Sequence, residues 1–294
     1  MQIGVVLVIF YFLFKSLFSN WNQIKEYSWD FHYPSLLISF VLVGLTYSIL
    51  VGVWNQILKQ SGYVISYSKM FKIWFISNLG RYIPGKVWQL LGMLYLLEKE
   101  KVPKSKGFTV AILAQALSSM AGILVMLGFL RYDFYRKLFS QSLWFLFVLL
   151  AFVAGVVVLI IYPRLLQKVI NLVLGFFKKD KISINYKPKN LLFYLLSYAG
   201  CWLLFGFCFL IFIRSITPAP FEMYFGVTGA FAGSVTIGFL AFFAPGGVGI
   251  REGVLVALLI SYFPLPVATL IALLSRVWIT VVELLLFLIA LAFK

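Results

Sequence analysis

Long apolar runs recur along the whole chain and are separated by short polar segments. A helix that rises about 1.5 Å per residue needs roughly 20 apolar residues to cross about 30 Å of hydrocarbon. The runs lack the in-and-out alternation of barrel strands, so they predict transmembrane helices. Six runs are long enough for a full crossing, at approximately residues 2–19, 34–58, 107–130, 142–162, 190–213 and 267–292.

Two further apolar stretches are interrupted near the middle by a Pro-Gly pair. The first, residues 70–97, contains Pro84-Gly85, and each of its halves is too short to cross the bilayer. It is therefore predicted to be a re-entrant hairpin, a helix that enters the membrane, turns and returns. The second, residues 222–263, contains Pro245-Gly246 and is open to two interpretations, because residues 225–244 alone are long enough to span.

The distribution of Lys and Arg among the loops predicts the topology. One set of loops carries fourteen of these residues and the other carries five, and the positive-inside rule places the richer set in the cytoplasm. The sides alternate correctly only if both broken stretches return to the side they came from, the first from the cytoplasm and the second from outside. Both termini are then cytoplasmic. The richer loops are 59–72, 99–106 and 163–189, and the poorer loops are 20–33, 131–141 and 214–221.

The order span, span, hairpin, span then occurs twice, with opposite orientations. The segment IPGKV at residues 83–87 resembles APGGV at residues 244–248. We therefore expect a single membrane domain, residues 1–294, with inverted repeats at about 1–130 and 142–292. The predicted fold is an all-α polytopic membrane protein with six full transmembrane helices plus two oppositely oriented re-entrant helical hairpins, an architecture typical of secondary transporters. Eight true spans are the alternative, and they would remove the symmetry.

Composition supports the membrane assignment and narrows the function. Hydrophobic residues make up 63% of the chain and charged residues 12%, which leaves too little polar surface for a soluble domain. The net charge of +16 is explained by loops facing anionic lipid headgroups, so nucleic acid is not an expected partner. Residues 2–18 lack a basic region and a cleavage site, and they predict a retained helix. Cys201 and Cys208 are expected to be buried thiols.

Charged residues flank both breaks and form the candidate substrate site. Ionisable residues within a membrane are costly and usually serve a pathway. Helices that restart after Gly85 and Gly249 would direct N–H groups and positive dipole ends inward, which suits a phosphate or carboxylate. Alternatively, these cations lie at the interface and only fix the topology. The predicted substrate-binding set is Asn78, Gly80, Arg81, Pro84, Gly85, Lys86, Pro245, Gly246, Gly247, Gly249, Arg251 and Glu252.

Two further charges lie on the last predicted span. Arg276 and Glu283 are seven residues apart, and this spacing of about two helical turns places them on one face. They are expected either to form an ion-pair network, with Glu252 as a candidate partner, or to belong to a proton route. The ion-pair interpretation is favoured.

Catalysis is not expected, because the chain lacks the necessary groups. Its nine acidic residues form no close carboxylate cluster for Mg²⁺, and its single histidine excludes an HExxH protease. We therefore expect no catalytic residue, no cofactor and no metal. The expected partners are membrane lipids, bound through phospholipid headgroups, and a homo-oligomer is left open. An alternative is a polyprenyl-phosphate-dependent glycosyltransferase or its subunit, with Glu252 as the acid, and a scaffold for a lipid-modifying complex is a third reading.

The two motifs, NLGRYIPGKVW at Asn78–Trp88 and PGGVGIREG at Pro245–Gly253, resemble the lysylphosphatidylglycerol synthase transmembrane-region family of flippase-like membrane proteins. The resemblance implies a multi-pass protein of the cytoplasmic membrane of bacteria or archaea. In the best understood branch, such a domain moves aminoacylated phosphatidylglycerol between leaflets and is fused to a soluble transferase domain. This sequence ends after its last span, so we expect lipid transport by alternating access without aminoacyl transfer.

Overall fold

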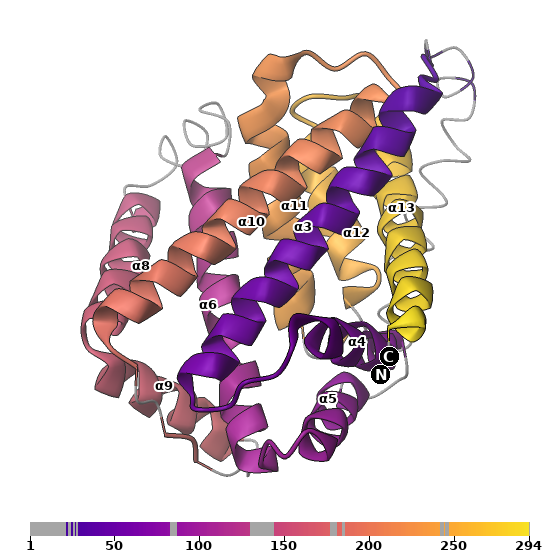
Figure 1. The fold of residues 1–294 in the computed structure, drawn as a ribbon. Coiled ribbons are helices and arrows are strands. Elements are labelled where there is room, and N and C mark those ends of the chain that lie inside the picture. The colour runs from indigo at the N-terminus through magenta and orange to yellow at the C-terminus, as the bar shows by residue number, and fades with distance from the viewer. Residues whose placement is uncertain are drawn as a thin grey trace.

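The structure is a computed structural model that describes most of the 294 residues as helices (Figure 1). Helices dominate the described part of the chain, and no strand occurs within it. The all-α fold predicted from the hydropathy pattern is therefore confirmed. The described residues are 22, 25, 27, 29–82, 87–129, 144–176, 181–183, 186–241, 244 and 247–293.

Long apolar helices confirm a multi-pass membrane protein. Five described helices are long and apolar enough to span a bilayer, and a sixth is added if one bent pair counts as a span. Four coincide with predicted spans, whereas predicted span 2–19 and loop 131–141 lie outside the described residues. The five are α3 (Tyr33–Gln60), α6 (Lys104–Phe129), α10 (Pro188–Arg214), Phe221–Leu240, which comprises η2 (Phe221–Met223) and α11 (Tyr224–Leu240), and α13 (Leu265–Ala292).

The bent pair lies where one uninterrupted span was predicted. Helix α8 (Trp144–Ile161) turns by 112° into α9 (Pro163–Phe176). Proline at the first position of α9 is tolerated because it needs no N–H partner there. The predicted basic loop 163–189 thus contains an amphipathic helix, whose Leu166 and Ile170 are buried while Leu165 and Val169 are exposed.

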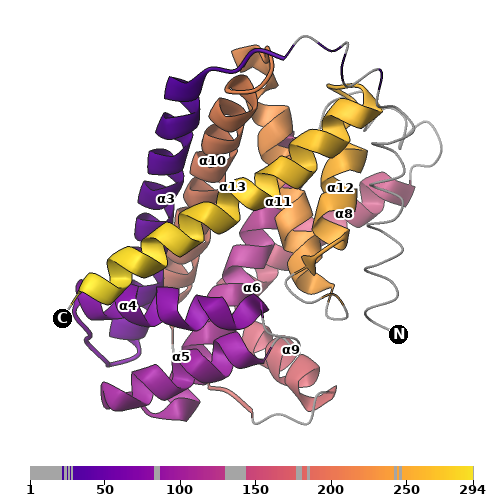
Figure 2. The same cartoon turned by 90° about the vertical axis from the view of Figure 1, so that its right-hand side faces the viewer.

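The first broken stretch folds as two short helices. Helix α4 (Tyr67–Asn78) continues into a 3-10 turn, η1 (Leu79–Tyr82), and α5 (Trp88–Lys99) follows. Each α-helix has 12 residues, a length of about 18 Å that cannot cross the hydrocarbon. The two helices pack against each other at the lower end of the bundle (Figure 2). This shape agrees with the predicted hairpin.

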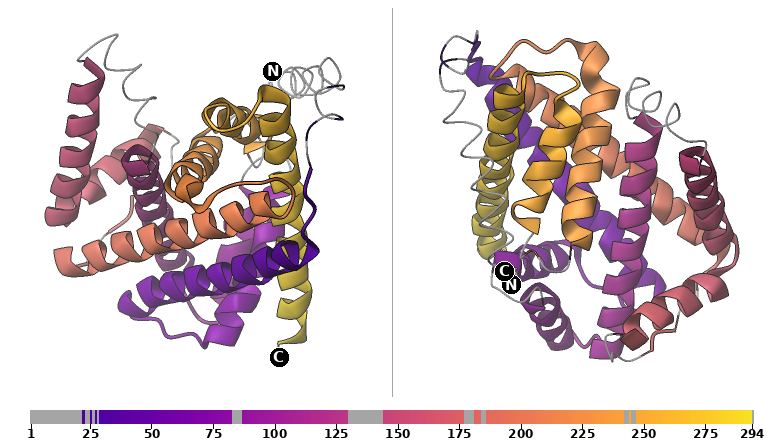
Figure 3. Two further views of the ribbon diagram at one scale, coloured as in Figure 1. Left: turned by 90° about the horizontal axis from the view of Figure 1, so that it is seen from above. Right: turned by 180° about the vertical axis from the view of Figure 1, so that it is seen from behind.

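The second broken stretch has one long arm and one short arm. The η2–α11 segment is long enough to span, whereas α12 (Ile250–Leu259) has 10 residues. The two arms pack side by side (Figure 3, right). Both interpretations of this stretch therefore apply in part: the chain passes through one span-length helix, breaks, and returns through a short helix. The opposite orientation of the two hairpins and the inverted repeat stay predictions.

The loops collect at two ends of the bundle, in the groups that their charges predicted. At one end, the Tyr186 hydroxyl donates to the Ile57 carbonyl at 2.9 Å, which joins the segment before α10 to the end of α3. At the other end, the amide of His32 donates to the Ser215 carbonyl at 2.9 Å. We call the first end the basic end; it contains α9 and the loops after α3 and after α5 (Figure 1).

Helix α13 contacts both broken stretches. It crosses in front of the bundle in Figure 2 and packs against α12, α3 and α4. Near its C-terminal end, the Lys72 ammonium of α4 donates to the Phe293 carbonyl at 2.8 Å. In its middle, the Trp278 ring stacks on Phe212 of α10 with centroids 4.7 Å apart. The charged residues of α13 are thus held on a rigid, well-packed element.

Candidate functional site

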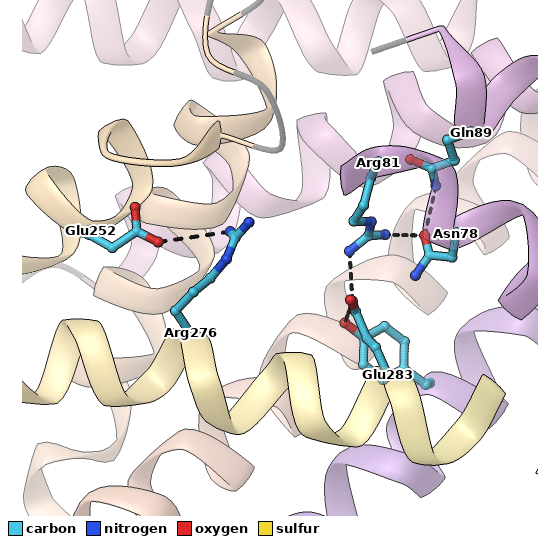
Figure 4. Close-up of polar contacts among 7 residues, drawn as sticks. Asn78, Arg81, Gln89, Glu252, Arg276 and Glu283 are labelled. Atoms are coloured by element: carbon cyan, nitrogen blue, oxygen red, sulfur yellow. Dashed lines mark hydrogen bonds and ion pairs between the residues drawn. The ribbon is translucent and has the colours of Figure 1, made fainter. Parts of the chain in front are cut away.

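The intramembrane charges come together along α13, between the two broken stretches (Figure 4). Arg276 and Glu283 project from the same side of this helix, because seven residues are about two turns. Figure 4 shows the Arg276 side chain directed toward Glu252 of α12 and the Glu283 side chain directed toward Arg81 of η1. Each end of the charged row therefore serves a different hairpin.

The pair at the first hairpin is short and largely buried. The Arg81 Nη1 atom lies 2.6 Å from the Glu283 Oε1 atom. The same oxygen accepts a second hydrogen bond from the Tyr47 hydroxyl of α3, also at 2.6 Å. Glu283 is 3% exposed and Arg81 is 29% exposed. The carboxylate is thus enclosed, while its guanidinium partner can still be reached.

Asn78 links the two arms of the first hairpin. Its Oδ1 atom accepts hydrogen bonds from Arg81 Nη2 and, at 2.8 Å, from Gln89 Nε2 of α5. The Asn78 Nδ2 atom is buried and has no hydrogen-bond partner among the described residues. A buried amide donor of this kind is free to bind a ligand oxygen.

Gly80 serves the same turn through its lack of a side chain. A Cβ atom at Gly80 would lie 2.5 Å from the Gln89 nitrogen and 2.7 Å from the Trp88 carbonyl carbon. Both neighbours are backbone atoms, which cannot rotate away as a side chain does. The glycine is therefore required for the close approach of η1 to the start of α5.

The second break is shaped by two glycines with positive φ angles. Gly247 has φ +68° and Gly249 has φ +84°, a region that disfavours side chains. The Glu252 Oε2 atom accepts a hydrogen bond from the Gly249 amide at 2.6 Å and so caps α12. Its Oε1 atom lies 3.8 Å from Arg276 Nη1. Glu252 thus begins the helix and holds Arg276 nearby.

Arg251 is the cation of the cluster without a carboxylate of its own. It is 8% exposed, and its Nη2 atom has no hydrogen-bond partner among the described residues. Its guanidinium lies over the Phe231 ring at 5.3 Å, and it is close enough to interact electrostatically with Arg276, Glu252, Tyr47 and Glu283. A buried cation with an unsatisfied donor fits an incoming anion.

The structure places the predicted site residues in different roles. Asn78, Arg81, Arg251, Glu252, Arg276 and Glu283 come together in the cluster, whereas Gly80, Gly247 and Gly249 shape the turns. Pro84, Gly85, Lys86, Pro245 and Gly246 lie outside the described residues.

Tyr47 belongs to the cluster but was missed at the sequence level. It lies within an apolar span, and nothing in the local pattern separates a tyrosine that bonds a carboxylate from one that packs. In the part of the chain that the structure describes, no group of three or more His, Cys, Asp or Glu residues could hold a metal ion.

These features define an all-α, multi-pass membrane protein with a charged cluster buried beside two broken helices. The sequence matches the family described as "Lysylphosphatidylglycerol synthase TM region" over residues 1–286. The chain therefore belongs to this flippase-like, lipid-related family, and the resemblance seen in the two motifs is confirmed. Comparisons with curated proteins and with solved structures find no match.

Proposed function

We propose that the protein is a lipid transporter that moves the headgroup of an anionic or zwitterionic phospholipid, or of a lipid phosphate, across the cytoplasmic membrane. The observation that carries the proposal is the Arg251 guanidinium, which is buried and leaves its Nη2 donor unsatisfied within the described residues. A phosphate oxygen placed there would supply both the missing acceptor and a negative charge.

The surroundings of Arg251 favour a phosphate over a neutral ligand. The other two guanidinium groups, Arg81 and Arg276, each lie beside a carboxylate, so a singly charged anion would balance the third. Guanidinium groups bind phosphate oxygens through paired N–H donors, which gives geometric selectivity as well as charge. The fatty-acid tails can stay in the bilayer while only the headgroup enters the cluster.

The proposed orientation follows from the charges at the two ends of the bundle. We place the basic end in the cytoplasm, where Lys and Arg meet anionic headgroups. The C-terminal end of α13 lies at this end (Figure 1), and both termini are assigned to the cytoplasm. Alternating access would arise from movement of one broken stretch relative to the other, as in transporters built from inverted repeats. The proposal assigns no catalytic residue.

Leaflet exchange in proteoliposomes tests the proposal. Purified protein is reconstituted with fluorescent phosphatidylglycerol or phosphatidylethanolamine, and the fraction of probe that reaches the opposite leaflet is measured over time. We expect wild-type protein to exchange at least one probe, Arg251→Ala to abolish that exchange, and Arg251→Lys to retain part of it.

Arg164→Ala is the matched control, because Arg164 is an exposed arginine of α9 and lies outside the cluster. Thermal melting in detergent separates loss of transport from loss of folding. Exchange of every probe at the wild-type rate by a folded Arg251→Ala protein would overturn the assignment of the site.

A further inference from the structure

The two carboxylates of the cluster are stabilised in different ways. Glu252 accepts a hydrogen bond from the Gly249 amide at 2.6 Å and lies in the first turn of α12, where the helix dipole favours a negative charge. This support does not depend on Arg276. Glu283 lies within the long helix α13, far from either end, and its charge is balanced by the Arg81 guanidinium at 2.6 Å.

The two members of the Arg81–Glu283 pair also differ in exposure. Arg81 is 29% exposed, whereas Glu283 is 3% exposed. An anion that reaches the cluster can therefore contact Arg81, while Glu283 stays enclosed. Tyr47 interacts electrostatically with both Arg81 and Arg251, which places these two cations around the same space. A phosphate bound at Arg251 would compete with Glu283 for Arg81.

The environment of Glu283 decides what happens when Arg81 turns away. The groups that act on this carboxylate are Tyr47 from α3, Arg81 from η1 and Arg251 from α12, and Arg276 lies two turns away on α13. Both arginines of the hairpins would then share the phosphate charge. A buried carboxylate that loses its counter-charge takes up a proton rather than keep an uncompensated charge.

From this competition we infer that Glu283 is a proton-binding site whose proton is exchanged against Arg81, so that one proton is carried with each anionic headgroup. The inference rests on the proposed function and supplies its energy source. On binding, the phosphate takes the Arg81 guanidinium, and Glu283 takes one proton from the water on the open side. On release, Arg81 returns to Glu283, and the proton leaves on the other side with the lipid.

Tyr47 is the positioning residue of this exchange. Its hydroxyl donates to the Glu283 Oε1 atom at 2.6 Å. A hydroxyl both donates and accepts, so it can bond Glu283 in the charged form and in the protonated form. It thereby keeps the side chain directed at the position to which Arg81 returns. A phenylalanine would leave the packing and remove this bond.

The stoichiometry makes the inference measurable. For a singly charged headgroup, lipid and proton together carry no net charge, so transport responds to a pH gradient and not to a membrane potential. A gradient of one pH unit corresponds to a factor of about ten in the leaflet ratio at equilibrium. The lipid accumulates in the leaflet that faces the more alkaline side.

The experiment uses full-length protein in proteoliposomes that contain fluorescent phosphatidylglycerol and a trapped pH-sensitive dye, with the membrane potential clamped. We expect wild-type protein to move probe away from the acidic side and to move about one proton with each probe. Glu283→Gln, which mimics the protonated form, is expected to show no response of lipid movement to the pH gradient and no proton flux. Tyr47→Phe is expected to lower the number of protons moved per lipid.

Glu100→Gln is the matched control, because Glu100 pairs with Lys69 at 2.7 Å outside the cluster. It should keep the pH-driven movement. Lipid movement by wild-type protein without proton flux would overturn this inference and leave the proposed function intact. Failure of wild-type protein to move any probe would instead overturn the proposed function. Proton flux that continues in Glu283→Gln would assign the proton to another group and also overturn the inference.

Discussion

Arg276 and Glu283 lie two turns apart on α13, and each pairs with a charge from a different broken stretch. Arg276 faces Glu252 at the start of α12, and Glu283 binds Arg81 at the end of α4. Since α13 itself packs on α12 and α4, the helix links the two hairpins. Any movement of one hairpin relative to the other must break one of these pairs or carry α13 with it.

The Arg81–Glu283 contact should be detectable as an energetic coupling. Arg81→Gln and Glu283→Gln are each expected to destabilise the protein by on the order of 2 kcal/mol, because each leaves a partner in a buried site without its counter-charge. The double variant should cost less than the sum of the two. Thermal unfolding of the detergent-solubilised protein measures the three values. Additive losses would show that the two side chains do not interact.

Gly80 should be intolerant of any side chain. In Gly80→Ala the Cβ atom would meet backbone atoms of Trp88 and Gln89 at 2.5–2.8 Å. We expect η1 and α5 to separate, with a loss of roughly 2 kcal/mol or more. Gly200→Ala is the control, because a Cβ atom at Gly200 meets nothing within 4 Å. That change should be neutral or stabilise α10 by up to about 1 kcal/mol. Equal melting temperatures for the two variants would contradict this account.

Glu252 should act mainly as a helix cap. Glu252→Gln keeps an oxygen that can accept from the Gly249 amide, whereas Glu252→Ala removes it. We expect Glu252→Ala to cost about 1 kcal/mol and to speed hydrogen exchange of the Gly249 amide, while Glu252→Gln stays close to the wild type in this respect. Exchange measured by mass spectrometry over residues 247–259 distinguishes the two. Equal protection in both variants would rule out the capping role.

Tyr186 should stabilise the basic end with a defined pH dependence. Burial raises the pKa of Tyr186 to about 12, and its hydroxyl donates to the Ile57 carbonyl at 2.9 Å. Tyr186→Phe is expected to cost about 1 kcal/mol near neutral pH. The raised pKa belongs to the folded state, so the contribution is complete below about pH 10, the unfolded value, and is lost as the pH rises toward about 12.

Unfolding of both proteins at pH 7, 9, 10 and 11 tests this expectation. The difference in stability between wild-type protein and Tyr186→Phe should be constant between pH 7 and 9 and should shrink at pH 11. A difference that grows with pH would have the wrong sign for a buried tyrosine and would contradict the assignment.

Much of the architecture was predictable from the sequence because lipid limits the choice. A backbone in hydrocarbon must satisfy its own hydrogen bonds, so apolar runs of sufficient length become helices. This reasoning located α3, α6, α10 and α13 to within a few residues. The 12-residue arms of the first hairpin were predictable for the same reason, since their length excludes a full crossing. The grouping of loops at two ends followed from the placement of Lys and Arg.

The tertiary structure alone decided how the charges pair. Arg81 and Glu283 are separated by 202 positions, and their contact depends on how η1 and α13 cross, which no local pattern encodes. The same holds for Tyr47, which looks like any aromatic residue of a span until its hydroxyl is placed against Glu283. Hydropathy sets which segments enter the membrane because it acts residue by residue. The geometry of helix packing sets which buried charges are balanced, and it leaves Arg251 ready for an anion.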